Sequence, residues 1–126
     1  MPVVLKIDPH RKVVYSTFYG RITDDELLGH RKAIATDPDF NPSFTDIVDF
    51  SAVTDVAISE KGVAAQAAKP SLFSSSVMHI IVAPADVMFQ LGGKFKEFAQ
   101  STRPNVFIVR TRAEAYQLLS SKPKSV

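Results

Sequence analysis

The sequence predicts an α/β fold in which helices pack on a mostly parallel sheet. Strand-type and helix-type segments alternate along most of the 126 residues. The apolar runs at residues 77–83 and 106–109 lack the polar alternation of half-exposed strands, which is typical of strands that are covered on both faces. Capping-box patterns at residues 23–26 and 111–114 predict two helix starts.

The N-terminal part predicts a β-hairpin followed by a helix. Residues 3–7 and 12–19 are rich in β-branched and aromatic side chains, and Asp8 and Pro9 favour a turn between them. Gly20 is expected to close the second strand. The capping box around Thr23 then starts a helix that runs to about residue 36, and the prolines in the segment that follows exclude a helix there.

The central segment changes from strand to helix. Residues 45–50 predict a buried strand, and residues 51–58 predict a polar loop. Ser59 is expected to be the N-cap of an alanine-rich helix over residues 60–69. After it we expect strands at the two apolar runs already named and helices over residues 86–101 and 112–119.

These elements predict the order β-β-α-β-α-β-α-β-α. We therefore expect one three-layer α/β domain over residues 1–119, with a mostly parallel sheet and one antiparallel strand from the N-terminal hairpin. Residues 120–126 are polar and are expected to form a flexible tail.

Composition restricts the classes of partner and compartment. The net charge is only +2 and the 15 basic residues are scattered, which argues against nucleic acid as a partner. Absence of cysteine excludes disulfides and thiolate sites. The start of the chain has no signal-peptide pattern, and no apolar run approaches the roughly 20 residues that span a bilayer. We expect a cytoplasmic protein, with a peripheral position at the membrane as the alternative.

The residues around Ser59 resemble a known family pattern. Residues 49–53 read Asp-Phe-Ser-Ala-Val, which is similar to the strand end of the SpoIIAA-like group, including the STAS domains of anti-sigma factor antagonists. In that family a serine at the start of the next helix is phosphorylated, and Ser59 lies at this position. Ala57, Ile58 and Glu60 differ from the Asp, Ser and Gly of the family pattern.

The whole chain resembles most closely the uncharacterised bacterial STAS/SEC14-like proteins. The shared marks are the segment Phe-Tyr-Gly-Arg-Ile-Thr-Asp-Asp-Glu-Leu at residues 18–27, the two-proline loop at residues 37–42 and the Val-Ala-Pro step at residues 82–84. This resemblance implies a SpoIIAA-like fold. It also implies that the chain binds a lipid or another apolar molecule, or docks at a membrane surface.

The third predicted helix carries the expected ligand-binding residues. Met88, Leu91 and Phe95 share one face at helical spacing, whereas Phe89 lies off this stripe. The glycine pair at residues 92–93 costs about 1 kcal/mol per residue relative to alanine, so the helix could hinge and open an apolar pocket. The alternatives are close packing at the glycines and a loop or second subunit that covers Phe89.

The sequence offers no catalytic constellation. Asp46, Asp49 and Asp55 could form a carboxylate cluster around the central strand end, but we favour the alternative that Asp49 caps loop amides while Asp46 and Asp55 face solvent. His79 is expected to be a hydrogen-bonded histidine of the sheet. Since neither a Gly-x-Ser-x-Gly elbow nor a helical His pair is present, no catalytic residue, metal or cofactor is expected.

These observations leave two functions of different class. The leading hypothesis is a non-enzymatic binding or regulatory module that holds a lipid or other apolar small molecule between the second and third helices and the sheet. The alternative is an anti-sigma-antagonist-like partner switch, in which phosphorylation of Ser59 or Ser51 releases a protein partner. An enzyme using the three aspartates is least favoured, because no nucleophile–base pair accompanies them. Homodimer formation stays open.

Overall fold

The computed structural model describes residues 3–121, which form one five-stranded sheet and four helices. The order β-β-α-β-α-β-α-β-α is confirmed. The strands are β1 (Val3–Asp8), β2 (Val13–Thr23), β3 (Thr45–Ala57), β4 (His79–Val82) and β5 (Val106–Val109), and the helices are α1 (Asp24–Thr36), α2 (Glu60–Ala68), α3 (Asp86–Phe98) and α4 (Arg112–Ser121). Residues 120 and 121 of the expected tail belong to α4, and residues 122–126 lie outside the described residues.

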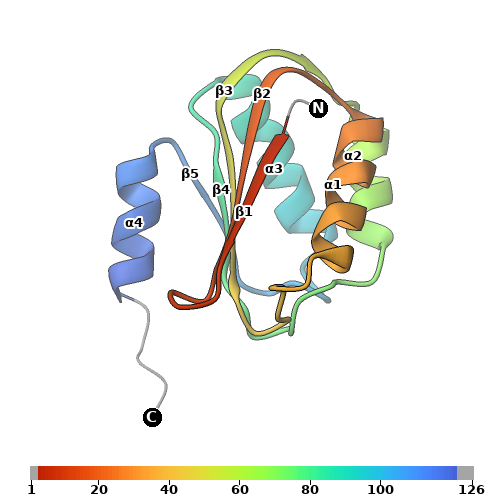
Figure 1. Cartoon of the computed structure of the whole chain (residues 1–126). Helices are drawn as coiled ribbons and strands as arrows, with labels where there is room; N and C mark the ends of the chain where they lie inside the picture. Colours follow the sequence, from red (N-terminus) through yellow and green to blue (C-terminus); the bar gives the residue numbers. More distant parts are fainter. Residues whose placement is uncertain (1–2, 122–126) are drawn as a thin grey trace.

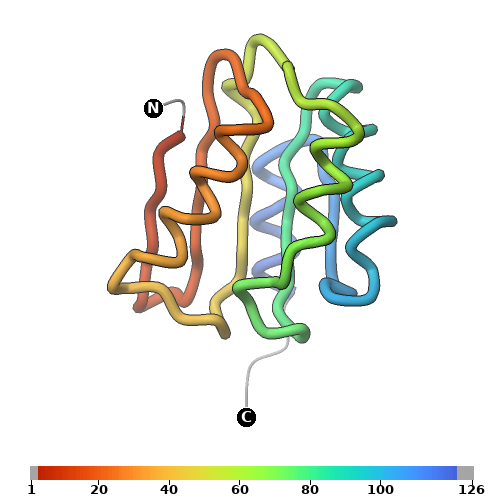
Figure 2. The backbone as a smooth tube through the Cα atoms, turned by 90° about the vertical axis from the view of Figure 1, so that its right-hand side faces the viewer, coloured from red at the N-terminus to blue at the C-terminus, as the bar shows by residue number. Residues whose placement is uncertain are grey.

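The sheet has the strand order β1-β2-β3-β4-β5. β1 pairs with β2 in antiparallel orientation, and every other neighbouring pair is parallel. Helices α1, α2 and α3 cover one face and α4 covers the other (Figure 1). Figure 2 shows the three helices side by side in front of the sheet, with α4 behind it. The predicted three-layer α/β architecture with one antiparallel strand is therefore confirmed.

Each face of the sheet has its own hydrophobic core, because neighbouring residues of a strand point to opposite faces. Under α1–α3 the buried residues include Phe18, Ile22, Phe50, Ile81 and Met88. Under α4 they are Ile47, Ile80, Val82, Val109 and Ala115.

The prediction of a polar loop over residues 51–58 is wrong, because β3 continues to Ala57. Its second half pairs with residues 19–23 of β2, which also continues past the expected end at Gly20. Gly20 adopts a φ of 68°, and the pairing register shifts on both sides of it, as in a β-bulge. Both strands curve over towards α1 and α2 (Figure 1), so that Ile22 is fully buried in the core beneath.

One of the two predicted capping boxes makes its capping hydrogen bond in the structure, and the other does not. Glu114 donates its backbone N–H to the Thr111 hydroxyl (3.2 Å), as the pattern predicts. Thr23 accepts no such bond and instead donates to the Glu26 carboxylate (3.2 Å), so its predicted capping bond is wrong. No helix within residues 3–121 has both the length and the apolar character needed to cross a bilayer.

The bend at Gly20 makes a testable prediction. Alanine at Gly20 would have to keep a positive φ, so Gly20→Ala should lower the free energy of unfolding by about 1–2 kcal/mol. Gly29, in the middle of α1, has open space around its missing side chain, and Gly29→Ala should raise stability by about 0.5–1 kcal/mol. Urea unfolding of both variants measures this. Equal effects of the two substitutions would contradict a strained bend at Gly20.

Candidate binding cavity

A cavity of about 160 Å³ lies between the sheet and helices α1–α3. Its wall is mainly apolar and is built from the sheet and all three helices. Phe50 and Ile81 contribute from the sheet, Leu27 from α1, Val63 from α2, and Met88 and Phe95 from α3.

The small side chains of α2 explain why space is left there. The helix has only nine residues, four of them alanines, and turns Val63 and Ala67 to the interior. On the other side of the cavity, α3 lies close to the sheet at Gly92, where an added Cβ would be 3.4 Å from the Ile108 side chain. The short side chains of α2 therefore leave space above the sheet, next to α3, which already contacts the sheet at Gly92.

The expected ligand-binding residues of α3 fall into two groups. Met88, Leu91 and Phe95 line the cavity. Phe89 is not among the lining residues. Its ring lies under the guanidinium of Arg110, at 3.9 Å from the centroid. A side chain of the same chain therefore covers Phe89, and its assignment as a ligand contact stays a prediction.

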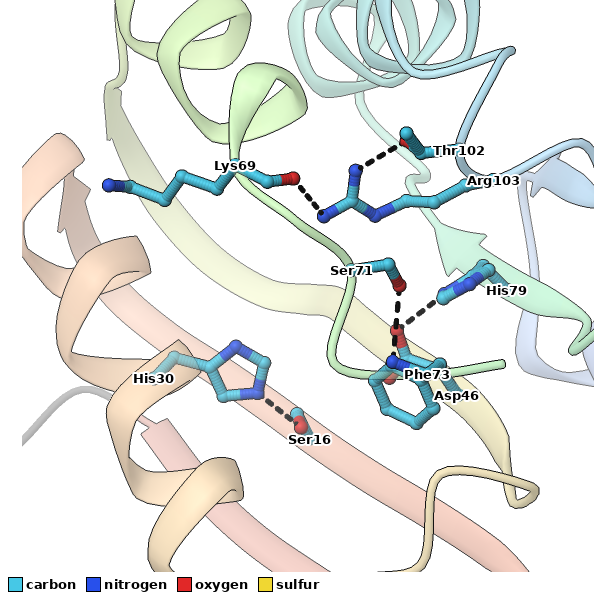
Figure 3. A network of polar contacts seen from close by, with 9 residues as sticks. All are labelled: Ser16, His30, Asp46, Lys69, Ser71, Phe73, His79, Thr102 and Arg103. Atoms are coloured by element: carbon cyan, nitrogen blue, oxygen red, sulfur yellow. Dashed lines mark hydrogen bonds and ion pairs between the residues drawn. The ribbon is translucent and has the colours of Figure 1, made fainter. Parts of the chain in front are cut away.

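One end of the cavity is polar. Its side chains come from four elements or loops: His30 and Arg31 from α1, Asp46 from β3, His79 from β4 and Arg103 from the segment before β5. Figure 3 shows four of them, all except Arg31, around the same region.

Asp46 and His79 form a buried pair. His79 Nδ1 lies 2.9 Å from Asp46 Oδ2, and the two side chains are only 6% and 13% exposed. Phe73 packs edge-on against the imidazole ring at 5.1 Å. The other carboxylate oxygen, Oδ1, is buried and has no hydrogen bond with a described residue. The expectation that Asp46 faces solvent is therefore wrong, because the alternation along β3 turns it beneath the helices.

Arg103 is buried without a carboxylate partner. It is 7% exposed and donates to the carbonyls of Ala67 and Lys69 (3.3 Å each) and to the Thr102 hydroxyl (3.2 Å). Figure 3 shows the bonds to Lys69 and Thr102. None of the ion pairs among the described residues includes it. Burial and the neighbouring charge of Arg31 lower its pKa, against a smaller opposite effect of Asp46.

The surroundings of His30 favour its uncharged form. It shares a hydrogen bond with the Ser16 hydroxyl (Figure 3) and packs edge-on against Phe18 at 5.0 Å. Burial lowers the pKa of His30 below its ordinary value of 6.5, although Asp46 acts in the opposite direction. The polar end therefore holds the charges of Arg31 and Arg103 against the single carboxylate of Asp46.

Asp49 lies on the opposite face of the sheet, under α4. Its side chain is 1% exposed and accepts hydrogen bonds from Arg112 Nε (2.7 Å), the Tyr15 hydroxyl (2.9 Å) and the backbone N–H of Ser51 (2.8 Å). Burial alone would raise the pKa of Asp49, but the hydrogen bonds from Ser51, Arg112 and Tyr15 outweigh it and lower the pKa. Asp49 caps a backbone amide as predicted, but within a strand rather than in a loop.

The structure does not bring the three aspartates together. Asp46 and Asp49 point to opposite faces, since they are an odd number of positions apart along one strand. Asp55 is exposed and lies 3.7 Å from Arg21, on the extended part of β3. No group of three His, Asp or Glu side chains within residues 3–121 is placed to hold a metal ion.

Ser59 is the N-cap of α2, as predicted. Its hydroxyl accepts from the Gly62 amide (2.9 Å) and donates to Asp24 at the start of α1 (3.1 Å). A phosphate on Ser59 would meet the carboxylates of Asp24 and Glu60. Ser51 is exposed on β3. Phosphorylation of either serine stays a prediction.

Sequence reasoning missed the polar end of the cavity. Leu27, His30, Arg31 and Ile34 all line the cavity and follow the i, i+3, i+4, i+7 spacing of one helix face. This spacing was the available signal for His30 and Arg31. Arg103 lies in a connection between α3 and β5, where no periodicity indicates which way a side chain points.

Comparison of the chain with protein-family models, curated proteins and solved structures finds no match in any of the three. The resemblance to SpoIIAA-like proteins therefore stays a prediction from the sequence motifs.

The buried carboxylate of Asp49 makes a testable prediction. Asp49→Asn should lower the free energy of unfolding by about 1–3 kcal/mol at neutral pH, because it removes charge-assisted hydrogen bonds in a buried site. Since the pKa of Asp49 is lowered in the folded state, this contribution is present above the ordinary value of 3.8 and is lost as pH falls through the folded pKa. The difference between the wild type and the variant should therefore shrink in acid.

Asp55→Asn is the matched control on the same strand. Its ion pair with Arg21 is exposed, so the cost should stay below about 1 kcal/mol. Urea unfolding over a series of pH values measures both variants. An equal cost for the two, or a cost at Asp49 that does not change in acid, would contradict the paired-carboxylate account.

Proposed function

We propose that this chain is a non-enzymatic binding module that holds a compact apolar molecule in the cavity beneath α1–α3. The cavity itself carries this proposal: about 160 Å³ of space with a mainly apolar wall. In another protein, an apolar cavity of roughly 150 Å³ stays dry and binds benzene or xenon.

The cavity volume favours a single ring or a short branched chain as the ligand. A long acyl chain would need α2 or α3 to move away from the sheet, because the cavity volume is about 160 Å³. Of the two ligand classes expected from the sequence, the compact apolar molecule therefore has more support than the lipid.

The same proposal includes a SpoIIAA-like fold and a cytoplasmic location. Support for the fold is the N-terminal hairpin, the alternation of strands and helices, and the strand end that leads to the Ser59 cap. The partner-switch alternative has less support, because Asp24 binds the Ser59 hydroxyl and would repel a phosphate there.

Toluene is a suitable probe of the cavity. With the free ligand at about ten times its Kd, binding should stabilise the folded chain by about 1.4 kcal/mol and raise the Tm accordingly. Differential scanning calorimetry of the full chain measures this shift.

Filling the cavity should remove the effect. Val63 is buried and lines the cavity from α2, so Val63→Phe places a ring in the space that toluene would take. Val87→Phe makes the same change at an exposed position of α3 outside the cavity lining and should keep the full shift. The proposal is contradicted if the wild type gains no stability from toluene, or if Val63→Phe gains as much as Val87→Phe.

A further inference from the structure

We propose that the natural ligand is a compact apolar carboxylic acid, whose carboxylate binds to Arg103 and Arg31 while its apolar body fills the cavity. This inference rests on the proposed function and adds the chemical class of the ligand. It follows from the charges at the polar end of the cavity.

The described residues do not balance the positive charge at this end of the cavity. Arg103 and Arg31 face a single carboxylate, that of Asp46, which is engaged with His79 at 2.9 Å. His30, which also lines the cavity, is shifted towards its uncharged form, because burial lowers its pKa. A buried charge without a counter-ion is costly, so an anion that enters here gains favourable electrostatic interaction.

Some N–H groups of Arg103 donate to no described residue. Its Nη1 donates to Ala67 and Thr102 and its Nη2 donates to Lys69, whereas Nε has no acceptor among the described residues. The second N–H of Nη2 is likewise without one. A planar guanidinium with neighbouring free donors suits a carboxylate, which accepts two parallel hydrogen bonds.

Arg31 provides a second positive charge at this end of the cavity. It is half-buried and lines the cavity from α1, and its side chain makes no hydrogen bond or ion pair with another described residue. Its charge lies near enough to Arg103 to lower the pKa of that group. An acid bound between them would relieve this repulsion.

The apolar body of such an acid has a defined place. Phe50, Ile81 and Met88 line the cavity from the sheet and α3, and the Phe95 ring lies beneath the Arg103 guanidinium at 5.4 Å from its centroid. These side chains favour an aromatic ring or a short branched chain. Benzoate, a ring with one carboxylate, is therefore the matched probe.

Calorimetric titration of the full chain with three probes of similar shape tests the inference. Benzoate should bind at least about tenfold more tightly than its neutral amide, benzamide, because a charge-assisted hydrogen bond contributes more than about 1.4 kcal/mol. Toluene measures binding of the ring alone. Phenylphosphonate offers a different anionic group on the same ring.

Variants then assign the effect to the two arginines. Arg103→Met and Arg31→Met should each reduce the affinity for benzoate by about tenfold while leaving that for toluene within about twofold. Lys32→Met removes the same charge from an exposed position next to Arg31 and should leave both affinities unchanged. If Arg103→Met fails to fold, because its bonds to Ala67 and Lys69 are lost, Arg31→Met carries the test alone.

The outcomes separate this inference from the proposed function. Toluene binding with no preference for benzoate over benzamide would overturn the inference and leave the proposed function intact. Tighter binding of phenylphosphonate than of benzoate would overturn the assignment to a carboxylate. Failure of both toluene and benzoate to bind would overturn the inference and the proposed function together.

Discussion

The parallel pairing of β2 and β3 is the interaction on which the rest of the structure depends. These are the longest strands, with 11 and 13 residues, and they stay paired beyond the bend at Gly20. The pairing connects the antiparallel hairpin to the parallel part of the sheet. Its curved end also places Ile22 in the core under α1–α3. The β2–β3 pair therefore joins the two parts of the sheet. It also forms one end of the layer that contains the cavity.

β3 also separates two kinds of polar chemistry, because its residues alternate between the faces of the sheet. Asp49, under α4, receives hydrogen bonds from a guanidinium, a phenol and a backbone amide, so its burial is compensated within the protein. Arg103, on the other face, has carbonyl and hydroxyl acceptors but no carboxylate among residues 3–121. Asp49, whose charge is compensated by hydrogen bonds, has a structural role, whereas Arg103, whose charge has no carboxylate partner among the described residues, lies beside the cavity. This difference is why we assign the ligand to the face of α1–α3.

Much of the fold could be predicted from the sequence, because apolar runs and capping residues are local signals. The strand at residues 106–109, the Ser59 cap and the order of elements all agree with the structure. The continuation of β2 and β3 could not be predicted, since polar residues at 51–55 suggest a loop and only pairing with β2 makes them a strand. The polar end of the cavity depends on residues up to about 70 positions apart, from His30 to Arg103, and no local pattern reports such contacts. The expectation that Asp46 faces solvent fails because its carboxylate is buried against His79, a residue from another strand.

The central claim is that the layer between the sheet and α1–α3 contains open apolar space that a small molecule can enter. A crystal structure of the wild-type chain under xenon pressure tests this claim most directly, because xenon binds in dry apolar cavities of this size. The account predicts a xenon peak bounded by Phe50, Ile81, Met88 and Phe95. Side chains that fill this space continuously, with no xenon between the sheet and the helices, would contradict it.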